Sequence, residues 1–218
     1  RRGLAVPERH RARLRRVRAG QAGEDGLGVW EETMAGLGAR VAAARRAGVA
    51  DLAPAFRDWL ERLGGGAAGS LALEMSPDSL SSAADDVLAE SLADLWRTRR
   101  PRELQAAHTL SGPHRDDLWI GAGAVDLRRV GSQGEQRTAA LAFLLAARDH
   151  LRRRAARPIL LLDDVLSELD PTRRTLLLDA VRDGGQTIVT SADPAVEEGL
   201  AQRPDAIVHV REGTLLGH

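Results

Sequence analysis

The chain has 218 residues, enough for one large domain or two small ones, and its 31 basic and 31 acidic residues balance. No global charge therefore favours nucleic acid or an anionic membrane as a partner. There is no cysteine, which excludes disulfides, thiolate metal sites and thiol nucleophiles. All 31 basic residues are arginine, so a phosphate-binding loop of the form G-x-x-x-x-G-K-[ST] cannot occur in this chain.

Hydropathy favours a water-soluble protein. No apolar run approaches the roughly 20 residues that span a bilayer. The first residues, RRGLAVPERHRARL, lack the apolar segment of a signal peptide. We therefore expect a soluble cytoplasmic protein with no membrane partner, and a core of mostly Leu, Val and Ala because aromatic residues make up only 3%.

The first hundred residues are predicted to be mainly helical. Residues 1–18 contain eight arginines and one acid, which suits a helix that contacts DNA phosphates or one with a solvated charged face. Residues 30–63 are expected to form two helices, the second opening near Pro54. A short strand is expected at 70–75, followed by a helix through Trp96 that Pro101 closes.

Two strands are expected at 118–120 and 124–127, joined by the Gly-rich turn at 121–123. The polar segment SGPHRDD at 111–117 precedes them. Its His114 and Arg115 could reach a phosphate group. Alternatively, the segment is a turn in which Asp and Arg side chains pair with each other.

A long helix is expected from about Ser132 to Arg154. Ser132 and Glu135 have the spacing of a capping box, in which each side chain bonds the backbone of the other. The positive end of such a helix, with exposed N–H groups and a nearby glycine at Gly134, is suited to bind phosphate.

The segment PILLLDDVLSELDP at 158–171 is the most informative in the chain. Its apolar run predicts a strand buried on both faces that ends in Asp163 and Asp164. Two adjacent carboxylates at the carboxyl end of a parallel strand suit Mg²⁺, which prefers one or two carboxylates plus water and phosphate oxygens. The alternative is a strand that ends in a solvated acidic turn.

The rest of the chain alternates strand and helix, as in a layered α/β sheet. Asp170 and Pro171 suit the start of a helix that Gly184 and Gly185 end. A buried strand follows at 186–190, then a helix capped by 191–194. A terminal strand pair is expected at 206–210 and 214–216.

Taken together, these motifs resemble the ATP-binding-cassette ATPases. Residues 132–136 match their signature motif, residues 159–164 the Walker B strand and residues 167–170 the D-loop. Within that superfamily, SGPHRDDL at 111–118, QRT at 136–138 and PILLLDDVLSELD at 158–170 resemble the RecF family of bacterial repair proteins. The implied fold is α/β, an ABC-ATPase-like head fragment. A mainly helical lobe with a small antiparallel sheet (1–156) would precede the C-terminal part of a P-loop NTPase parallel sheet (157–218).

The resemblance implies roles for the carboxylates and their neighbours. Asp163 would hold Mg²⁺, and Asp164 would take the place of the catalytic Glu that polarises water. A carboxylate one carbon shorter at this position fits slow, switch-like hydrolysis. The D-loop residues Ser167 and Asp170 would couple the two ATP sites of a dimer.

The signature helix would complete the ATP site of a second protomer. It would contact the γ-phosphate of the partner's ATP in an ATP-dependent, head-to-tail homodimer. The residues of this contact would be Ser132, Gln133, Gly134, Glu135 and Gln136. Thr190 and Ser191 fall where many relatives have a switch histidine.

RecF proteins imply a function in DNA repair, replication restart, recombination and the SOS response. The family binds gapped or single-stranded/double-stranded DNA and ATP and, with RecO and RecR, promotes RecA loading. Because the lysine-bearing P-loop is missing, we expect a fragment that binds ATP and Mg²⁺ only together with an N-terminal region and is inactive alone. The alternatives are a head fragment of another structural-maintenance or Rad50-like ATPase, and a non-catalytic binding module.

Overall fold

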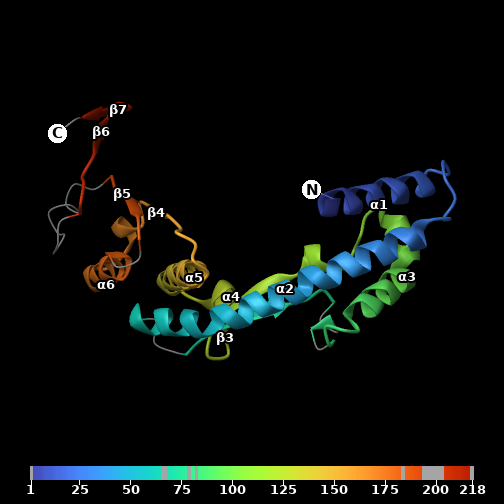
Figure 1. The fold of residues 1–218 in the computed structure, drawn as a ribbon, viewed down its shortest axis with the longest axis horizontal. Coiled ribbons are helices and arrows are strands. Elements are labelled where there is room, and N and C mark those ends of the chain that lie inside the picture. Colours follow the sequence, from blue (N-terminus) through green and yellow to red (C-terminus); the bar gives the residue numbers. More distant parts are fainter. Residues whose placement is uncertain are drawn as a thin grey trace. The chain divides into compact units, whose positions relative to one another are not determined.

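The computed structural model describes residues 2–64, 68–77, 80–81, 83–182, 185–192 and 204–216, with side chains from residue 8 onward. The chain divides into two compact units, drawn in Figure 1. Unit 1 comprises residues 1–61 and 65–147, and unit 2 comprises residues 62–64 and 148–218. This division falls within one helix, nine residues before the boundary at 156/157 placed from the sequence.

Unit 1 is mainly helical, with one small sheet. Its elements in chain order are α1 (Arg2–Arg18), α2 (Leu27–Arg62), β1 (Gly69–Glu74), α3 (Leu88–Ala106), the 3₁₀ turn η2 (Pro113–Arg115), β2 (Asp117–Ala122), β3 (Val125–Asp126), α4 (Leu127–Val130) and the larger part of α5 (Gln133–Arg153).

The sheet of unit 1 is antiparallel, in the order β1-β2-β3. Strand β1 pairs with β2 along its whole length, from Gly69 opposite Ala122 to Glu74 opposite Asp117. Gly123 has a φ of 61° in the turn that joins β2 to β3, a backbone conformation that glycine adopts without steric cost. The strands expected at 70–75, 118–120 and 124–127 are confirmed, although Leu127 begins α4.

Helix α2 is a single helix of 36 residues, so the prediction of two helices over 30–63 was wrong. Pro54 lies inside it, where proline removes one backbone hydrogen bond at a cost of about 3 kcal/mol. Side chains are buried on both sides of Pro54, including Met34 before it and Phe56 and Leu60 after it. Each contributes about 1.5–3 kcal/mol, which offsets the lost bond and holds the helix together.

Helix α3 likewise continues past its proline. Pro101 lies inside it, and the helix ends at Ala106, followed by the cap residue Ala107, which has a φ of 56° and donates its N–H to Leu104 O. The expectation that Pro101 closes the helix was therefore wrong. Packing again explains the continuation, because Trp96 before the proline and Glu103 after it are both buried.

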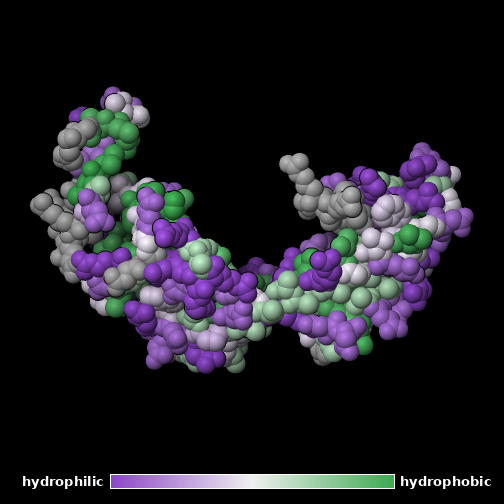
Figure 2. Space-filling view, in the orientation of Figure 1, coloured by the Kyte–Doolittle hydropathy of each residue, from purple (hydrophilic) through white to green (hydrophobic). Residues whose placement is uncertain are grey.

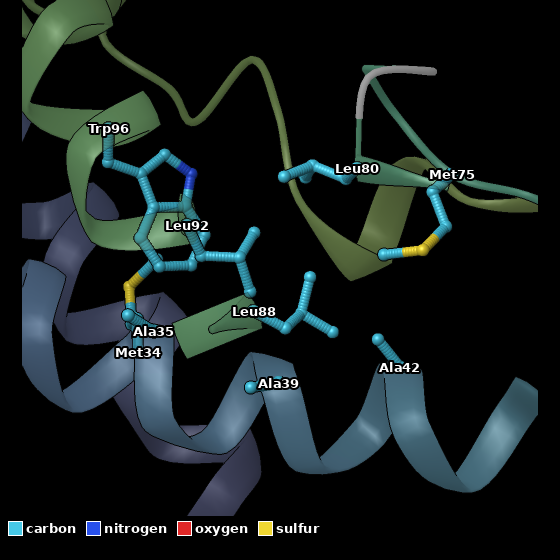
Figure 3. Close-up of a cluster of buried hydrophobic side chains, with 9 residues drawn as sticks. All are labelled: Met34, Ala35, Ala39, Ala42, Met75, Leu80, Leu88, Leu92 and Trp96. Carbon is cyan, nitrogen blue, oxygen red and sulfur yellow. The ribbon is translucent and has the colours of Figure 1, made fainter. Parts of the chain in front are cut away.

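The main core of unit 1 lies between α2 and α3. Figure 3 shows small and flexible side chains from α2 facing the larger ones of α3, with Met75 and Leu80 at one end. Small side chains let the two backbones approach, so that an aromatic-poor sequence still forms a dense core. The cluster consists of Met34, Ala35, Ala39, Ala42, Met75, Leu80, Leu88, Leu92 and Trp96.

The described part of unit 2 contains two short sheets and, after the end of α5, one longer helix. Its elements are β4 (Leu160–Asp163), the 3₁₀ turn η3 (Leu166–Glu168), α6 (Pro171–Arg182), β5 (Thr187–Thr190), β6 (His209–Arg211) and β7 (Thr214–Leu216). Strands β4 and β5 are parallel and in register, while β6 and β7 form an antiparallel pair. These strands were expected, but the helix expected after residues 191–194 lies outside the described residues.

The prediction that β4 and β5 are buried on both faces was wrong. Leu160 and Leu162 are buried, but Leu161 is 66% exposed and Ile188 of β5 is 48% exposed. In the described part of unit 2 the sheet has only these two strands, and α6 supplies buried side chains such as Leu177. Apolar side chains of β6 and β7 are exposed too, and Figure 2 shows them as green surface at the upper left.

Candidate functional site

The centre of the site is the carboxyl end of the β4–β5 pair, where Asp163 lies opposite Thr190. Residues alternate between the faces of a strand, so Asp163 shares the exposed face with Leu161, and Thr190 shares it with Ile188. The Thr190 hydroxyl donates a hydrogen bond to Asp163 Oδ1 over 2.5 Å. The sequence placed these residues 27 positions apart, and the parallel register brings them into contact.

Asp164 is held by the same threonine. Its N–H donates to both Thr190 O and Thr190 Oγ1, each over 3.1 Å. Its backbone lies in the left-handed region, with a φ of 50°, and both Asp163 and Asp164 are exposed to solvent. Non-glycine residues seldom adopt positive φ, although aspartate does so more readily than most.

The segment after the two aspartates folds back onto them. The Ser167 hydroxyl donates to Asp164 O over 2.8 Å, and Arg174 Nε donates to Leu166 O over 3.2 Å. Asp170 caps α6 by accepting a hydrogen bond from Arg173 N over 3.0 Å, as its position before Pro171 predicted. The structure therefore joins Asp163, Asp164, Ser167 and Thr190 into one cluster at the start of the turn.

These carboxylates fit a magnesium ion by their chemistry. No group of three or more His, Asp or Glu side chains suited to a metal occurs among the described residues. Mg²⁺ does not require one, because it is commonly bound by one or two carboxylates while water and phosphate complete its shell. Asp163 is exposed with one oxygen fixed by Thr190, which leaves its other oxygen directed away from that bond.

The start of α5 in unit 1 has the capping box that the sequence predicted. Ser132 N donates to Glu135 Oε2 over 2.8 Å, and Glu135 N donates to Ser132 Oγ over 3.3 Å. Gln136 Nε2 donates to Gly131 O over 3.1 Å, which ties the loop to the helix. Gly134 lies in the first turn and accepts a hydrogen bond from the Thr138 hydroxyl over 2.8 Å.

Residues 132–136 are thus a hydrogen-bonded, largely solvent-facing helix start. Ser132, Gln133, Glu135 and Gln136 are exposed. Such a helix end can accept an anion through its backbone N–H groups. In the free chain, the Ser132 hydroxyl donates to Glu135 Oε2 over 2.7 Å, so a ligand would have to compete with that bond.

The polar segment 111–117 is a compact turn held by long-range contacts. Gly112 has a φ of 118°, and a Cβ atom there would lie 2.8 Å from the Trp96 ring, so only glycine fits. Trp96 Nε1 donates to Ser111 O over 2.8 Å. Arg45 of α2 bonds Pro113 O and pairs with Asp116 over 3.3 Å.

The Asp–Arg pairing expected within this segment was wrong in its partners, because the arginines come from outside it. Asp116 and Asp117 pair with Arg45 and Arg128, as in a structural turn. His114 and Arg115 remain on the exposed side. The partner arginines were missed, because nothing in their local sequence marks Arg45, 71 residues from Asp116, as a contact.

The electrostatic environment of the turn is positive. Burial lowers the pKa of His114; the hydrogen bond with Thr109 O opposes this, and the nearby Arg11 and Arg115 lower it further. His114 is therefore expected to be neutral at pH 7 and to offer a hydrogen bond rather than a charge. The exposed positive charges at this place come from Arg11 of α1 and Arg115.

A second polar cluster, which the sequence analysis missed, is buried where α1 meets α3. It consists of His10, Glu31, Arg100, Glu103 and Thr109. Arg100 makes two hydrogen bonds with the Glu31 carboxylate, which raise the pKa of Arg100. The sequence signal was weak, since Thr, Glu and Arg are more often exposed and His is intermediate.

The sequence of the chain resembles those of known proteins over most of its length. No protein-family model matches it. It is 34% identical over 199 residues to the DNA replication and repair protein RecF of Synechocystis sp., a match covering 90% of this chain and 51% of that protein. It is 39% identical over 171 residues to RecF of Chloroflexus aggregans (77% and 43%) and 41% identical over 144 residues to RecF of Geobacillus thermodenitrificans (65% and 38%).

The chain is RecF-like. It spans about half the length of the curated RecF proteins that it matches. Its fold agrees with a structure of the recombination mediator protein RecF-ATP in the RecFOR pathway, with a TM-score of 0.82 at 24% identity. A RecF-ATPrS structure gives a TM-score of 0.80 at 25% identity, and both matches cover 98% of this chain and 56% of the RecF chain.

The comparisons confirm the predicted resemblance to RecF proteins and the predicted fold class. An ABC-ATPase-like α/β head fragment was expected, and the chain matches RecF structures over nearly all of its own length. The described residues include no helix with both the length and the apolarity needed to cross a membrane.

Proposed function

We propose that this chain is part of a RecF-type DNA repair and replication-restart ATPase, in which it supplies the signature helix and the Walker B carboxylates. The observation that carries the proposal is the 34–41% identity to RecF proteins over 144 to 199 residues. The cluster of Asp163, Asp164 and Thr190 at the end of a parallel strand supports it, because ligands of such sheets bind at that edge.

In this proposal each carboxylate has a separate task. Asp163 holds Mg²⁺, and Asp164 orients the attacking water. When bound, Mg²⁺ supplies charge neutralisation at the transferring phosphoryl group. Ser167 and Asp170 position the turn that follows, so that the D-loop can couple two sites across a dimer.

The remaining parts of the ATP site come from outside this chain. No lysine occurs in it, so the P-loop that holds the β- and γ-phosphates lies on other residues. Residues 132–136 contact the γ-phosphate of ATP held by a second protomer, through the helix N-terminus and the Ser132 hydroxyl. ATP and Mg²⁺ are therefore bound only together with the P-loop region outside this chain, and the bound ATP then supports an ATP-dependent homodimer.

The DNA contact is proposed to include the basic surface of unit 1 formed by Arg11, His114 and Arg115. Both arginines are exposed, and their positive fields act on His114. Exposed Arg15 and Arg18 extend the positive surface along α1, one and two turns beyond Arg11. Spaced positive charges of this kind suit the phosphates of a nucleic-acid backbone.

The biological setting is proposed from the RecF likeness. The protein is cytoplasmic, binds gapped DNA and acts with RecO and RecR to load RecA in recombination and the SOS response. The relatives reported above are RecF proteins, which favours this interpretation over a Rad50-like head.

The experiment measures Mg-ATP hydrolysis by the longer protein that carries this chain together with its P-loop region (the native-length protein). The same measurement is made on its Asp163→Asn variant. Removing a group that stabilises transition-state charge typically lowers kcat by about 100-fold or more. We expect that loss for Asp163→Asn, and near wild-type hydrolysis for Asp179→Asn, an exposed aspartate on α6. A wild-type protein without DNA-stimulated or basal ATPase activity, or an Asp163→Asn variant with full activity, would contradict the proposal.

A further inference from the structure

Thr190 is the residue that joins the two aspartates of the proposed site. Its hydroxyl donates its only proton to Asp163 Oδ1 over 2.5 Å and accepts the N–H of Asp164 over 3.1 Å. One side chain therefore contacts the carboxylate of the first aspartate and the backbone of the second. A branched β-carbon restricts the χ1 rotation of threonine, so the hydroxyl is held in this direction.

The consequence for Asp163 is a fixed carboxylate plane. An unrestrained aspartate at a strand end rotates freely about its terminal torsion. With Oδ1 held by Thr190, Oδ2 is the oxygen that this bond leaves free to face a ligand. A carboxylate restrained in this way loses less conformational entropy when a cation binds.

The consequence for Asp164 is a stabilised left-handed backbone. A φ of 50° costs a non-glycine residue roughly 1–2 kcal/mol, and such a backbone persists only where its surroundings over-determine it. Thr190 O and Oγ1 both accept the Asp164 N–H, and the Ser167 hydroxyl donates to Asp164 O. These bonds fix the direction in which the Asp164 side chain leaves the strand end.

We propose that Thr190 is a positioning residue of the proposed ATP site, which sets the orientation of the Mg²⁺-binding carboxylate of Asp163 and the backbone of Asp164. This inference rests on the proposed function and deepens it. It gives the last residue of β5 a role in orienting the metal ligand, in place of the phosphate sensing expected of a switch residue. Partners of metal ligands typically change metal affinity or activity by about 10- to 100-fold when they are removed.

The test uses Thr190→Val, which keeps the shape of the side chain but removes the hydroxyl. The native-length protein is titrated with Mn²⁺ in the presence of a non-hydrolysable ATP analogue, and bound Mn²⁺ is measured by electron paramagnetic resonance. We expect Thr190→Val to weaken Mn²⁺ binding by about 10-fold. Thr190→Ser, which retains the hydroxyl, is expected to keep most of the affinity. In steady-state ATP hydrolysis, Thr190→Val is expected to lower kcat and to raise the Mg²⁺ concentration needed for the half-maximal rate. The KM for ATP should change little.

The matched control is Thr187→Val, the same substitution at the first residue of the same strand. The Thr187 hydroxyl is buried without a hydrogen-bond partner among the described residues, so its loss leaves Mn²⁺ binding unchanged. Equal Mn²⁺ affinity of wild type and Thr190→Val overturns the positioning role alone. Equal weakening of Mn²⁺ binding by Thr190→Val and Thr190→Ser also overturns the positioning role. Side-chain packing, and not the hydroxyl, would then be the cause of the weaker binding. If the wild type shows no nucleotide-dependent Mn²⁺ binding, both the proposed function and the positioning role of Thr190 are overturned.

Discussion

The imidazole of His10 is completely buried, although most of the other described residues of α1 are exposed. Its Nδ1 lies 3.2 Å from Thr109 Oγ1, and its Nε2 has no hydrogen-bond partner in the part of the chain that the structure describes. Burial lowers the pKa of His10; Glu31 opposes this shift and Arg100 adds to it. The folded protein therefore keeps His10 neutral.

The stability of unit 1 is accordingly expected to fall in mild acid. Because the pKa of His10 is lowered by folding, the unfolded chain takes up this proton first as the pH falls below about 6.5. The contribution of neutral His10 to the stability of unit 1 is fully present above that pH, and it is lost as the pH falls towards the pKa of His10 in the folded state. One proton accounts for at most about 1.4 kcal/mol per pH unit.

The measurement is urea unfolding of the 218-residue chain between pH 7.5 and 5.5 for wild type, His10→Gln and the control His108→Gln. Glutamine can keep a hydrogen bond to Thr109 but does not titrate, so His10→Gln should show a smaller loss of stability than wild type. The stability of His10→Gln is still expected to fall somewhat with pH, because burial also lowers the pKa of His114. Identical pH profiles of wild type and His10→Gln would show that His10 does not control this transition.

At the scale of elements, local signals in the sequence predicted most strands and helix starts. The capping box of Ser132 and Glu135 and the cap at Asp170 depend on residues within three positions, and both are present. Pro54 and Pro101 misled the prediction, because the packing that carries α2 and α3 through them involves residues distant in sequence. The prediction that β4 is buried on both faces failed for a related reason. An apolar run indicates a strand but not how many of its faces are covered.

The basic surface made by α1 and η2 gives a prediction about DNA. Arg115→Glu in the native-length protein is expected to weaken binding to gapped DNA regardless of base sequence, because phosphate contacts carry no sequence information. Loss of one phosphate contact should reduce the slope of log K against log salt concentration by about 1. Fluorescence anisotropy at several salt concentrations measures both effects.

Arg57→Glu is the matched control for that experiment. Arg57 is also exposed, and it lies in α2 beside β1 rather than near η2. The same change of charge there should leave the salt slope as in wild type. Equal weakening by the two variants would mean that total charge, not the Arg11–His114–Arg115 surface, controls DNA binding.

At the scale of the whole molecule, the two segments proposed to contact ATP fall in different units. The signature residues 132–136 belong to unit 1, and the Walker B aspartates belong to unit 2. The sequence predicted both segments because each is a short motif. It did not predict that Thr190 contacts both aspartates, since this contact depends on the strand register between β4 and β5. The order of the motifs in the chain was sufficient to predict the resemblance to RecF proteins, whereas the contacts of Thr190 could be found only from the strand register.

Ser132→Arg tests whether the two segments serve a dimer. If residues 132–136 contact ATP held by a second protomer, a bulky cation at position 132 blocks closure of that interface while leaving ATP binding to the first protomer intact. The lost cap costs only about 1 kcal/mol, which a melting curve can verify. Multi-angle light scattering of the native-length protein with ATP should show dimers for wild type and for Gln105→Arg, which adds the same side chain at an exposed position of α3. It should show monomers for Ser132→Arg, and nucleotide binding by both variants should match wild type. ATP-driven dimers of Ser132→Arg would contradict the trans contact, whereas loss of its ATP binding would place residue 132 beside the nucleotide of its own protomer.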